Sequence, residues 1–79
     1  MGDITHYFSK IQVVVMKMTH GTFHVGDTIR IKGKKSDFIQ KVSSLQIESV
    51  DVRSARKGQL VGLKVNRPAR EGDKVYLVP

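Results

Sequence analysis

The chain has no cysteine, which excludes a disulfide framework, a thiolate metal site and a cysteine nucleophile. It also lacks a long apolar run, since the longest, Val13 to Met16, falls far short of the roughly 20 residues that a membrane-spanning helix needs. Residues 1–6 contain no basic stretch leading into an apolar one, so no secretory signal is expected. Together these absences predict a reducing, cytoplasmic setting and no membrane partner.

Acidic residues are scarce, with 7 Asp and Glu against 14 Lys and Arg, which leaves a formal net charge of +7. Such a field attracts polyanions, among them RNA, DNA and acidic protein surfaces. The charge favours this class of partner, although a basic surface also serves solubility. Because a chain of 79 residues has room for one hydrophobic core, we expect a single domain over residues 1–79.

The motifs of nucleotide, metal and nucleophilic chemistry are missing as well. The segment 33–36, Gly-Lys-Lys-Ser, lacks the earlier glycine, the Ser or Thr directly after the first lysine, and the following helix that a P-loop requires. His20 and His24 lie at a turn and a strand start without a cluster of carboxylates beside them, and no Gly-x-Ser-x-Gly elbow occurs. We therefore expect no catalytic residue, no metal site, no cofactor and no bound nucleotide, and the protein is not expected to be an enzyme.

The clearest pattern in the sequence is the alternation of apolar and polar residues. In residues 28–32, Ile29 and Ile31 face one side of a strand, and the polar residues between them face the other. The same alternation predicts further strands in residues 45–48, 61–65 and 75–78. About six short strands without a crossover helix indicate an all-β sandwich or barrel, and closure into one small barrel removes the exposed edges.

Three local features qualify this pattern. Residues 13–18 are apolar at nearly every position, which predicts a central strand that is covered on both faces or lies along a barrel seam. The parity of the apolar residues switches near Ser43 and Ser44, which predicts a bulge or a strong bend there. Asp27 and Asp73 each follow a glycine and precede a strand, where a carboxylate accepts backbone N–H bonds and holds the turn.

Basic side chains are the strongest chemical signal in the sequence. Arg30 and Lys32 share the outward side of one strand, Lys34 and Lys35 lie in the loop that follows, and Lys41 lies across the same hairpin. Together they predict one positive face. The candidate nucleic-acid-binding residues are therefore Arg30, Lys32, Lys34, Lys35 and Lys41.

The turn glycines, their aspartates and the core aliphatic residues recur in a definite order. The pattern is Gly21-x3-Val25-Gly26-Asp27-x-Ile29-x-Ile31-x-Gly33, Val42-x-Ser44-Leu45-Gln46, Ala55-x2-Gly58-x2-Val61-Gly62-Leu63 and Gly72-Asp73. It resembles the second domain of translation GTPases, of which elongation factor Tu is one, over residues 4–78. The resemblance implies a closed, Greek-key-like β-barrel without the GTPase domain, used against RNA, ribosomal subunits or neighbouring protein domains.

Two functions follow from the charge and the resemblance. The first is a non-catalytic binding module of translation-factor type, a stand-alone translation elongation factor-like protein that associates with RNA or the ribosome through its basic face. The second arises because the chain also resembles barrels that are appended to some collagenase-like peptidases. The chain would then be a protein-interaction module that serves a separate enzyme of this kind.

Overall fold

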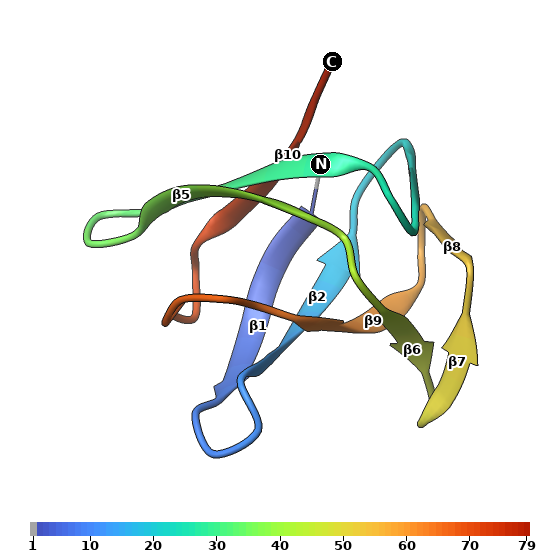
Figure 1. The fold of residues 1–79 in the computed structure, drawn as a ribbon, viewed down its shortest axis with the longest axis horizontal. Coiled ribbons are helices and arrows are strands. Elements are labelled where there is room, and N and C mark those ends of the chain that lie inside the picture. Colours follow the sequence, from blue (N-terminus) through green and yellow to red (C-terminus); the bar gives the residue numbers. More distant parts are fainter. Residues whose placement is uncertain (1) are drawn as a thin grey trace.

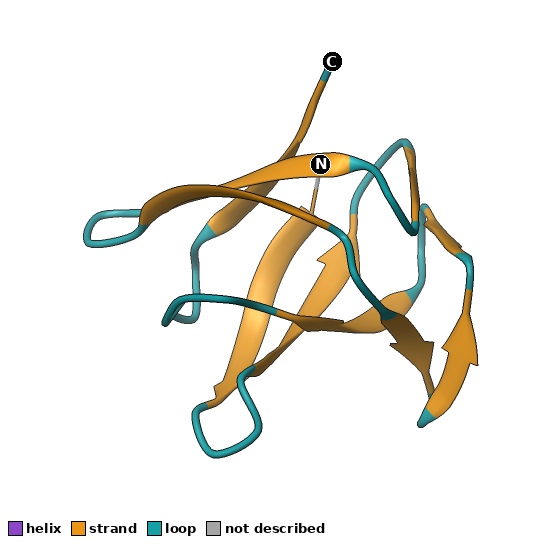
Figure 2. Cartoon of the chain, in the orientation of Figure 1, coloured by secondary structure: helices purple, strands orange, loops and turns teal. Residues whose placement is uncertain are grey.

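The computed structural model describes residues 2–79, which form short β-strands joined by turns (Figure 2). The strands are β1 (Gly2–Phe8), β2 (Val13–Met18), β3 (Thr22–His24), β4 (Thr28–Lys32), β5 (Asp37–Lys41), β6 (Leu45–Ile47), β7 (Val50–Val52), β8 (Ser54–Arg56), β9 (Leu60–Lys64) and β10 (Lys74–Val78). The described residues include no helix with the length and apolarity needed to cross a bilayer.

Eight of the strands form one antiparallel sheet in the order β5-β4-β10-β1-β2-β9-β6-β7, and β3 pairs with β8 in a small second sheet. β5 and β6 lie near opposite ends of that order, yet only residues 42–44 separate them along the chain. The sheet must therefore curl until its ends meet, and Figure 1 shows the chain passing from β5 directly into β6. This confirms the predicted all-β barrel. The strands described in residues 2–79 number ten rather than about six, because tight turns divide the chain into shorter pieces.

The inner face of the barrel carries the core. Ile29 and Ile31 are fully buried, whereas Lys32 on the other face of β4 is exposed, so the predicted alternation is confirmed. β2, β9 and β10 supply further aliphatic side chains in the same way. The largest fully buried side chains are Phe23, Ile4, Met16, Met18, Ile29, Ile31, Leu45, Leu63, Val14, Val42, Val61 and Val65.

A buried glutamine bridges the seam between β5 and the end of β9. Gln40 is only 6% exposed. Its Nε2 donates to the carbonyl oxygen of Lys64 over 2.9 Å, and its Oε1 accepts from the backbone N–H of Asn66 over 2.8 Å. One side-chain amide thus satisfies one backbone acceptor and one backbone donor where the edge strand β5 lies against the end of β9.

The bend predicted near Ser43 and Ser44 is present. Residues 42–44 lie outside any strand, and the buried residues change from even positions, Gln40 and Val42, to the odd position Leu45. The bend lets the chain leave the β5 edge of the sheet and pair with β9 through β6.

Three turns share one construction. They cover residues 24–27, 56–59 and 70–73. The third residue of each is a glycine with φ between 88° and 98°, a left-handed conformation that favours glycine. The side chain of the fourth residue, Asp27, Gln59 or Asp73, accepts a bond of 2.8–3.0 Å from the backbone N–H of the first. The predicted role of both aspartates is confirmed, and Gln59 performs the same task in the turn of residues 56–59.

Candidate functional site

The structure distributes the five predicted basic residues over one hairpin and its loop. Arg30 and Lys32 lie on the outer face of β4, and Lys41 lies on the outer face of β5, where it pairs in register with Thr28. Lys34 and Lys35 lie in the loop between these strands, next to the turn formed by residues 70–73. The structure thus brings three of the five to one face and places the other two at its end.

The charge of Arg30 is engaged by a neighbour on the same hairpin. Its Nε and Nη2 donate to Oδ1 and Oδ2 of Asp37 over 2.8 Å each. This hydrogen-bonded pair raises the pKa of Arg30 and lowers the pKa of Asp37. Because folding lowers the pKa of Asp37, the stabilisation it contributes is present at neutral pH and is lost as the pH falls through that lowered pKa.

A second ion pair joins Lys74 to Asp3 over 2.8 Å and raises the pKa of Lys74. The ion pairs found within residues 2–79 leave the other four predicted cations unengaged, namely Lys32, Lys34, Lys35 and Lys41. Lys32 and Lys41 therefore carry the positive charge of this face, Lys34 and Lys35 carry that of the loop at its end, and Arg30 contributes a neutralised pair.

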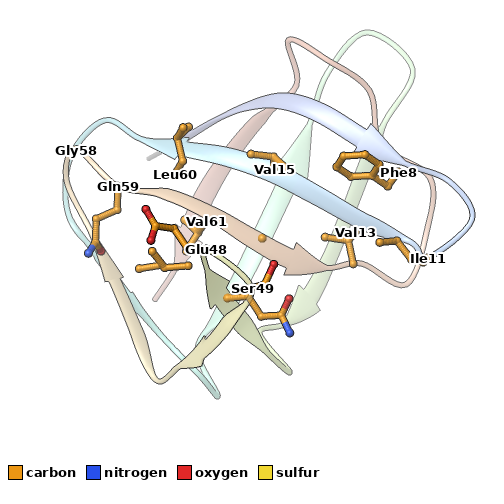
Figure 3. A pocket seen from close by; sticks show the side chains of 13 residues that line it. Phe8, Ile11, Val13, Val15, Glu48, Ser49, Gly58, Gln59, Leu60 and Val61 are labelled. Atoms are coloured by element: carbon orange, nitrogen blue, oxygen red, sulfur yellow. The ribbon is translucent and has the colours of Figure 1, made fainter.

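A groove of about 590 Å³ lies elsewhere, on the outer face of β2 and β9 (Figure 3). Its apolar wall comes from β1, the turn after it, β2 and β9. These side chains are Phe8, Ile11, Val13, Val15 and Leu60. Phe8, Ile11 and Leu60 are 45%, 58% and 56% exposed. In Figure 3, Glu48 and Ser49 face Val15 and Leu60 across the groove.

Gly62 forms the floor of this groove, where it pairs in register with Val15. A Cβ at Gly62 would meet its nearest atoms at 3.6 Å in Val13 and 3.8 Å in Gln46, which are ordinary contacts. Gly62 is also not among the residues with positive φ. Neither space nor backbone conformation requires glycine here, although glycine in a strand costs roughly 0.5–1 kcal/mol relative to alanine. Such a glycine often marks the close approach of another backbone or ligand.

The rim of the groove holds strained backbone. In residues 2–79, the non-glycine residues with positive φ are Gln12 at 55°, Glu48 at 51° and Ser49 at 65°. Gln12 lies between Ile11 and Val13, which both line the groove, and Glu48 and Ser49 line the groove themselves. Two successive left-handed residues are the geometry of a type I′ hairpin turn, for which Asn-Gly is preferred. Conformations of this kind concentrate at functional sites.

Replacing this strained pair by the preferred residues, Glu48→Asn with Ser49→Gly, should raise the free energy of unfolding by about 1 kcal/mol. Urea unfolding followed by circular dichroism measures the change. The matched control is Lys34→Asn with Lys35→Gly in the β4–β5 loop, where the φ angles are not positive and no gain is expected. Equal midpoints for wild type and the Glu48→Asn, Ser49→Gly variant would show that the turn stores no strain.

The sequence predicted the strand beneath this groove but not the groove. β2 is central, between β1 and β9, as expected. Its outer face is not covered, however, because Val13 and Val15 remain half-buried. Two features of the sequence could have revealed the groove. Residues 13–18 are apolar on both faces of the strand, and a glycine lies inside the predicted strand at position 62.

Two of the histidines in the described chain lie next to a carboxylate. His6 Nδ1 lies 3.3 Å from Glu71 Oε1, and His24 Nδ1 lies 3.6 Å from Asp27 Oδ2. Within residues 2–79, no group of three His, Asp or Glu side chains is placed to hold a metal ion.

The order of strands and turns has a counterpart among known domains. Residues 12–68 match the family described as elongation factor Tu domain 2. The chain belongs to this family. The resemblance expected from the turn glycines and core residues is thus confirmed for the elongation factor Tu domain 2 barrel.

The relatives of this elongation factor Tu domain 2 barrel include peptidases. It is 39% identical to an uncharacterized protease of Methanocaldococcus jannaschii over 79 residues, which are 99% of this chain and 19% of that protein. It is 37% identical to a collagenase of Porphyromonas gingivalis over 77 residues, which are 96% of this chain and 21% of the collagenase. The chain therefore spans about a fifth of the length of the curated relatives it matches.

A solved structure shares the fold. The C-terminal domain of a Geobacillus thermoleovorans protein described as a U32 peptidase superimposes with a TM-score of 0.91, covering 99% of this chain and 90% of that domain at 21% identity. These relatives are peptidases and not translation factors. They give no support to the expected identity as a stand-alone translation elongation factor-like protein, nor to RNA or the ribosome as the partner.

Proposed function

We propose that this barrel is a non-catalytic, protein-binding domain that serves a peptidase of the collagenase type. The observation that carries the proposal is the match of nearly the whole chain to part of the Porphyromonas gingivalis collagenase and of the Methanocaldococcus jannaschii protease. Since the chain corresponds to about a fifth of those proteins, the barrel would assist an enzyme whose catalytic residues lie elsewhere.

The chemistry of the groove supports binding over catalysis. Among the described residues that line it, Glu48 is the only titratable side chain. A single exposed carboxylate lacks the partner that general acid–base or nucleophilic catalysis requires. By contrast, exposed apolar side chains such as Phe8 and Leu60 are typical of surfaces that contact another protein.

Association with RNA stays a prediction, and one observation favours it. Tyr76 is 45% exposed and pairs in register with Arg30, so an aromatic ring lies on the same face as Lys32 and Lys41. An exposed ring among cations suits stacking on an unpaired base. Phe23 and Phe38, in contrast, are buried in the core and are not available for stacking.

Exchange of domains tests the proposed function. In the Porphyromonas gingivalis collagenase, the segment matched by this chain is either deleted or replaced by residues 1–79. We expect deletion to lower collagen hydrolysis by about tenfold, the equivalent of roughly 1.4 kcal/mol of lost binding, and the replacement to restore most of it. Full activity after deletion, or a chimera no better than the deletion, would contradict the proposal.

The RNA alternative is measured in parallel by fluorescence anisotropy of a labelled RNA hairpin with this chain. Phosphate contacts would make its affinity fall steeply between about 50 and 200 mM salt. Tight, salt-dependent binding that Lys32→Glu with Lys41→Glu abolishes, combined with an inactive chimera, would move the function to the basic face.

A further inference from the structure

We infer that the groove on β2 and β9 is a docking site for an extended, acidic and apolar segment of a partner protein. The inference rests on the proposed function, because it names the surface and the partner chemistry of the same domain. It draws on the continuity of the groove, its glycine floor, the lysines around it and the strained turns at its rim.

The groove extends further than its main hollow. A second hollow of about 230 Å³ continues from it across β9 toward β6. The two share four lining residues, which are Ile11, Val13, Gln46 and Gly62. One trough therefore crosses three neighbouring strands, and its length suits several residues of extended chain better than a single side chain.

The floor of the groove leaves room for the backbone of a partner segment, and its walls can contact the side chains of that segment. At Gly62 a partner chain can approach the sheet without meeting a Cβ, as close backbone approach requires. On either side of Gly62, Val13 and Leu60 present exposed or half-buried apolar surface. Alternate residues of an extended segment would place apolar side chains on these walls.

Charge complementarity selects an acidic partner. In register, Lys17 faces Leu60 and Lys64 faces Val13, so a lysine lies on the outer face at each end of the apolar floor. Two more exposed cations, Lys10 and Lys57, directly adjoin groove-lining residues. These four are Lys10, Lys17, Lys57 and Lys64. The ion pairs described in residues 2–79 engage none of them, and Glu48 is the acidic side chain of the lining. An apolar core with a basic rim is complementary to an apolar segment flanked by Asp or Glu.

The binding experiment uses the full chain labelled with ¹⁵N and a synthetic peptide in which Val and Leu alternate with Asp and Glu. We expect the peptide to shift the amide resonances of Val13, Val15, Leu60 and Gly62, with an affinity that weakens as salt rises. Two control peptides replace the acidic residues by Lys or the apolar residues by Ser, and both should bind at least about tenfold more weakly.

Variants locate the site. Gly62→Val fills the floor. Because a Cβ at this position meets only ordinary contacts and β-branched residues suit strands, we expect the melting temperature to be unchanged or raised while peptide affinity falls by about tenfold or more. If that variant melts lower than wild type, Gly62→Ala tests the same floor with a smaller group. Lys17→Glu with Lys64→Glu should also weaken binding. Lys32→Glu with Lys41→Glu, which changes the net charge equally on another face, should leave it nearly unchanged.

Three results with the peptides overturn the inference. These are no shift at millimolar peptide, shifts centred on the basic hairpin, and equal binding of the lysine-substituted peptide. Groove resonances that instead change on dilution of the chain alone would assign the groove to a second copy and would equally overturn it.

The collagenase chimera and the peptide titration together distinguish a wrong docking site from a wrong proposed function. An inactive collagenase chimera with intact peptide binding rejects the peptidase role and keeps the groove. An active chimera that tolerates Gly62→Val, without peptide binding by the chain, rejects the groove and keeps the peptidase role.

Discussion

Replacing Gln40 by leucine should lower the free energy of unfolding by about 2 to 5 kcal/mol, although leucine is apolar and its position is buried. The amide of Gln40 donates to the carbonyl of Lys64 and accepts from the N–H of Asn66. Leucine would leave both backbone groups without a partner at the seam, and each unsatisfied group costs about 1 to 3 kcal/mol. Urea unfolding followed by circular dichroism measures the loss.

Gln46→Leu is the matched control. Gln46 is exposed, and its Nε2 donates to Asp51 over 3.0 Å, so the same substitution should change stability by less than about 0.5 kcal/mol. Equal midpoints for the two variants would show that Gln40 does not hold the seam.

A Gln40→Glu variant adds a second test, in which the stability loss should depend on pH in a known direction. A carboxylate at this position would meet the carbonyl of Lys64, and burial would raise its pKa in the folded state. The stability difference from wild type should therefore shrink as the pH falls and grow as it rises through that raised pKa. A difference that does not vary with pH would contradict this account of the seam.

Gly33→Ala should destabilise the fold by about 1 to 3 kcal/mol through overpacking. An added Cβ would overlap the carboxylate oxygen Oδ1 of Asp73. Asp73 is 4% exposed, and its other oxygen holds the backbone N–H of Arg70 over 3.0 Å, so the side chain cannot withdraw without breaking the turn. Thermal unfolding followed by calorimetry measures the effect.

Gly62→Ala provides the contrast, because its Cβ has room and the substitution should be neutral or stabilise by roughly 0.5–1 kcal/mol. A double-mutant cycle completes the test. In an Asp73→Ala background the cost of Gly33→Ala should fall, since the overlapping oxygen is gone. Additive effects of the two substitutions would mean that Gly33 and Asp73 do not contact each other.

The elements of this fold were predictable because their causes are local. Ile29 and Ile31 alternate with polar residues, and period-two alternation specifies a strand with one buried face. Asp27 and Asp73 follow glycines, and each carboxylate reaches an N–H three residues earlier in the chain. The bend at residues 42–44 was visible as a change of parity.

The candidate sites were less accessible to the same reasoning. Arg30 was predicted as part of the positive face, but the register of β4 on β5 places Asp37 within reach of its guanidinium. The alternation did not predict a strand at residues 54–56, yet these residues form β8, since they pair with β3. The pairing of strands decided both outcomes.

The sequence by itself determined that this protein is a small all-β barrel with structural Gly-Asp turns and an excess of positive charge. Only the tertiary structure decided that Gln40 bridges the seam and that Val13, Leu60 and Gly62 share one groove. The physical reason is register: alternation states which residues face outward, but only the alignment of β2, β9 and β6 brings their outward positions side by side.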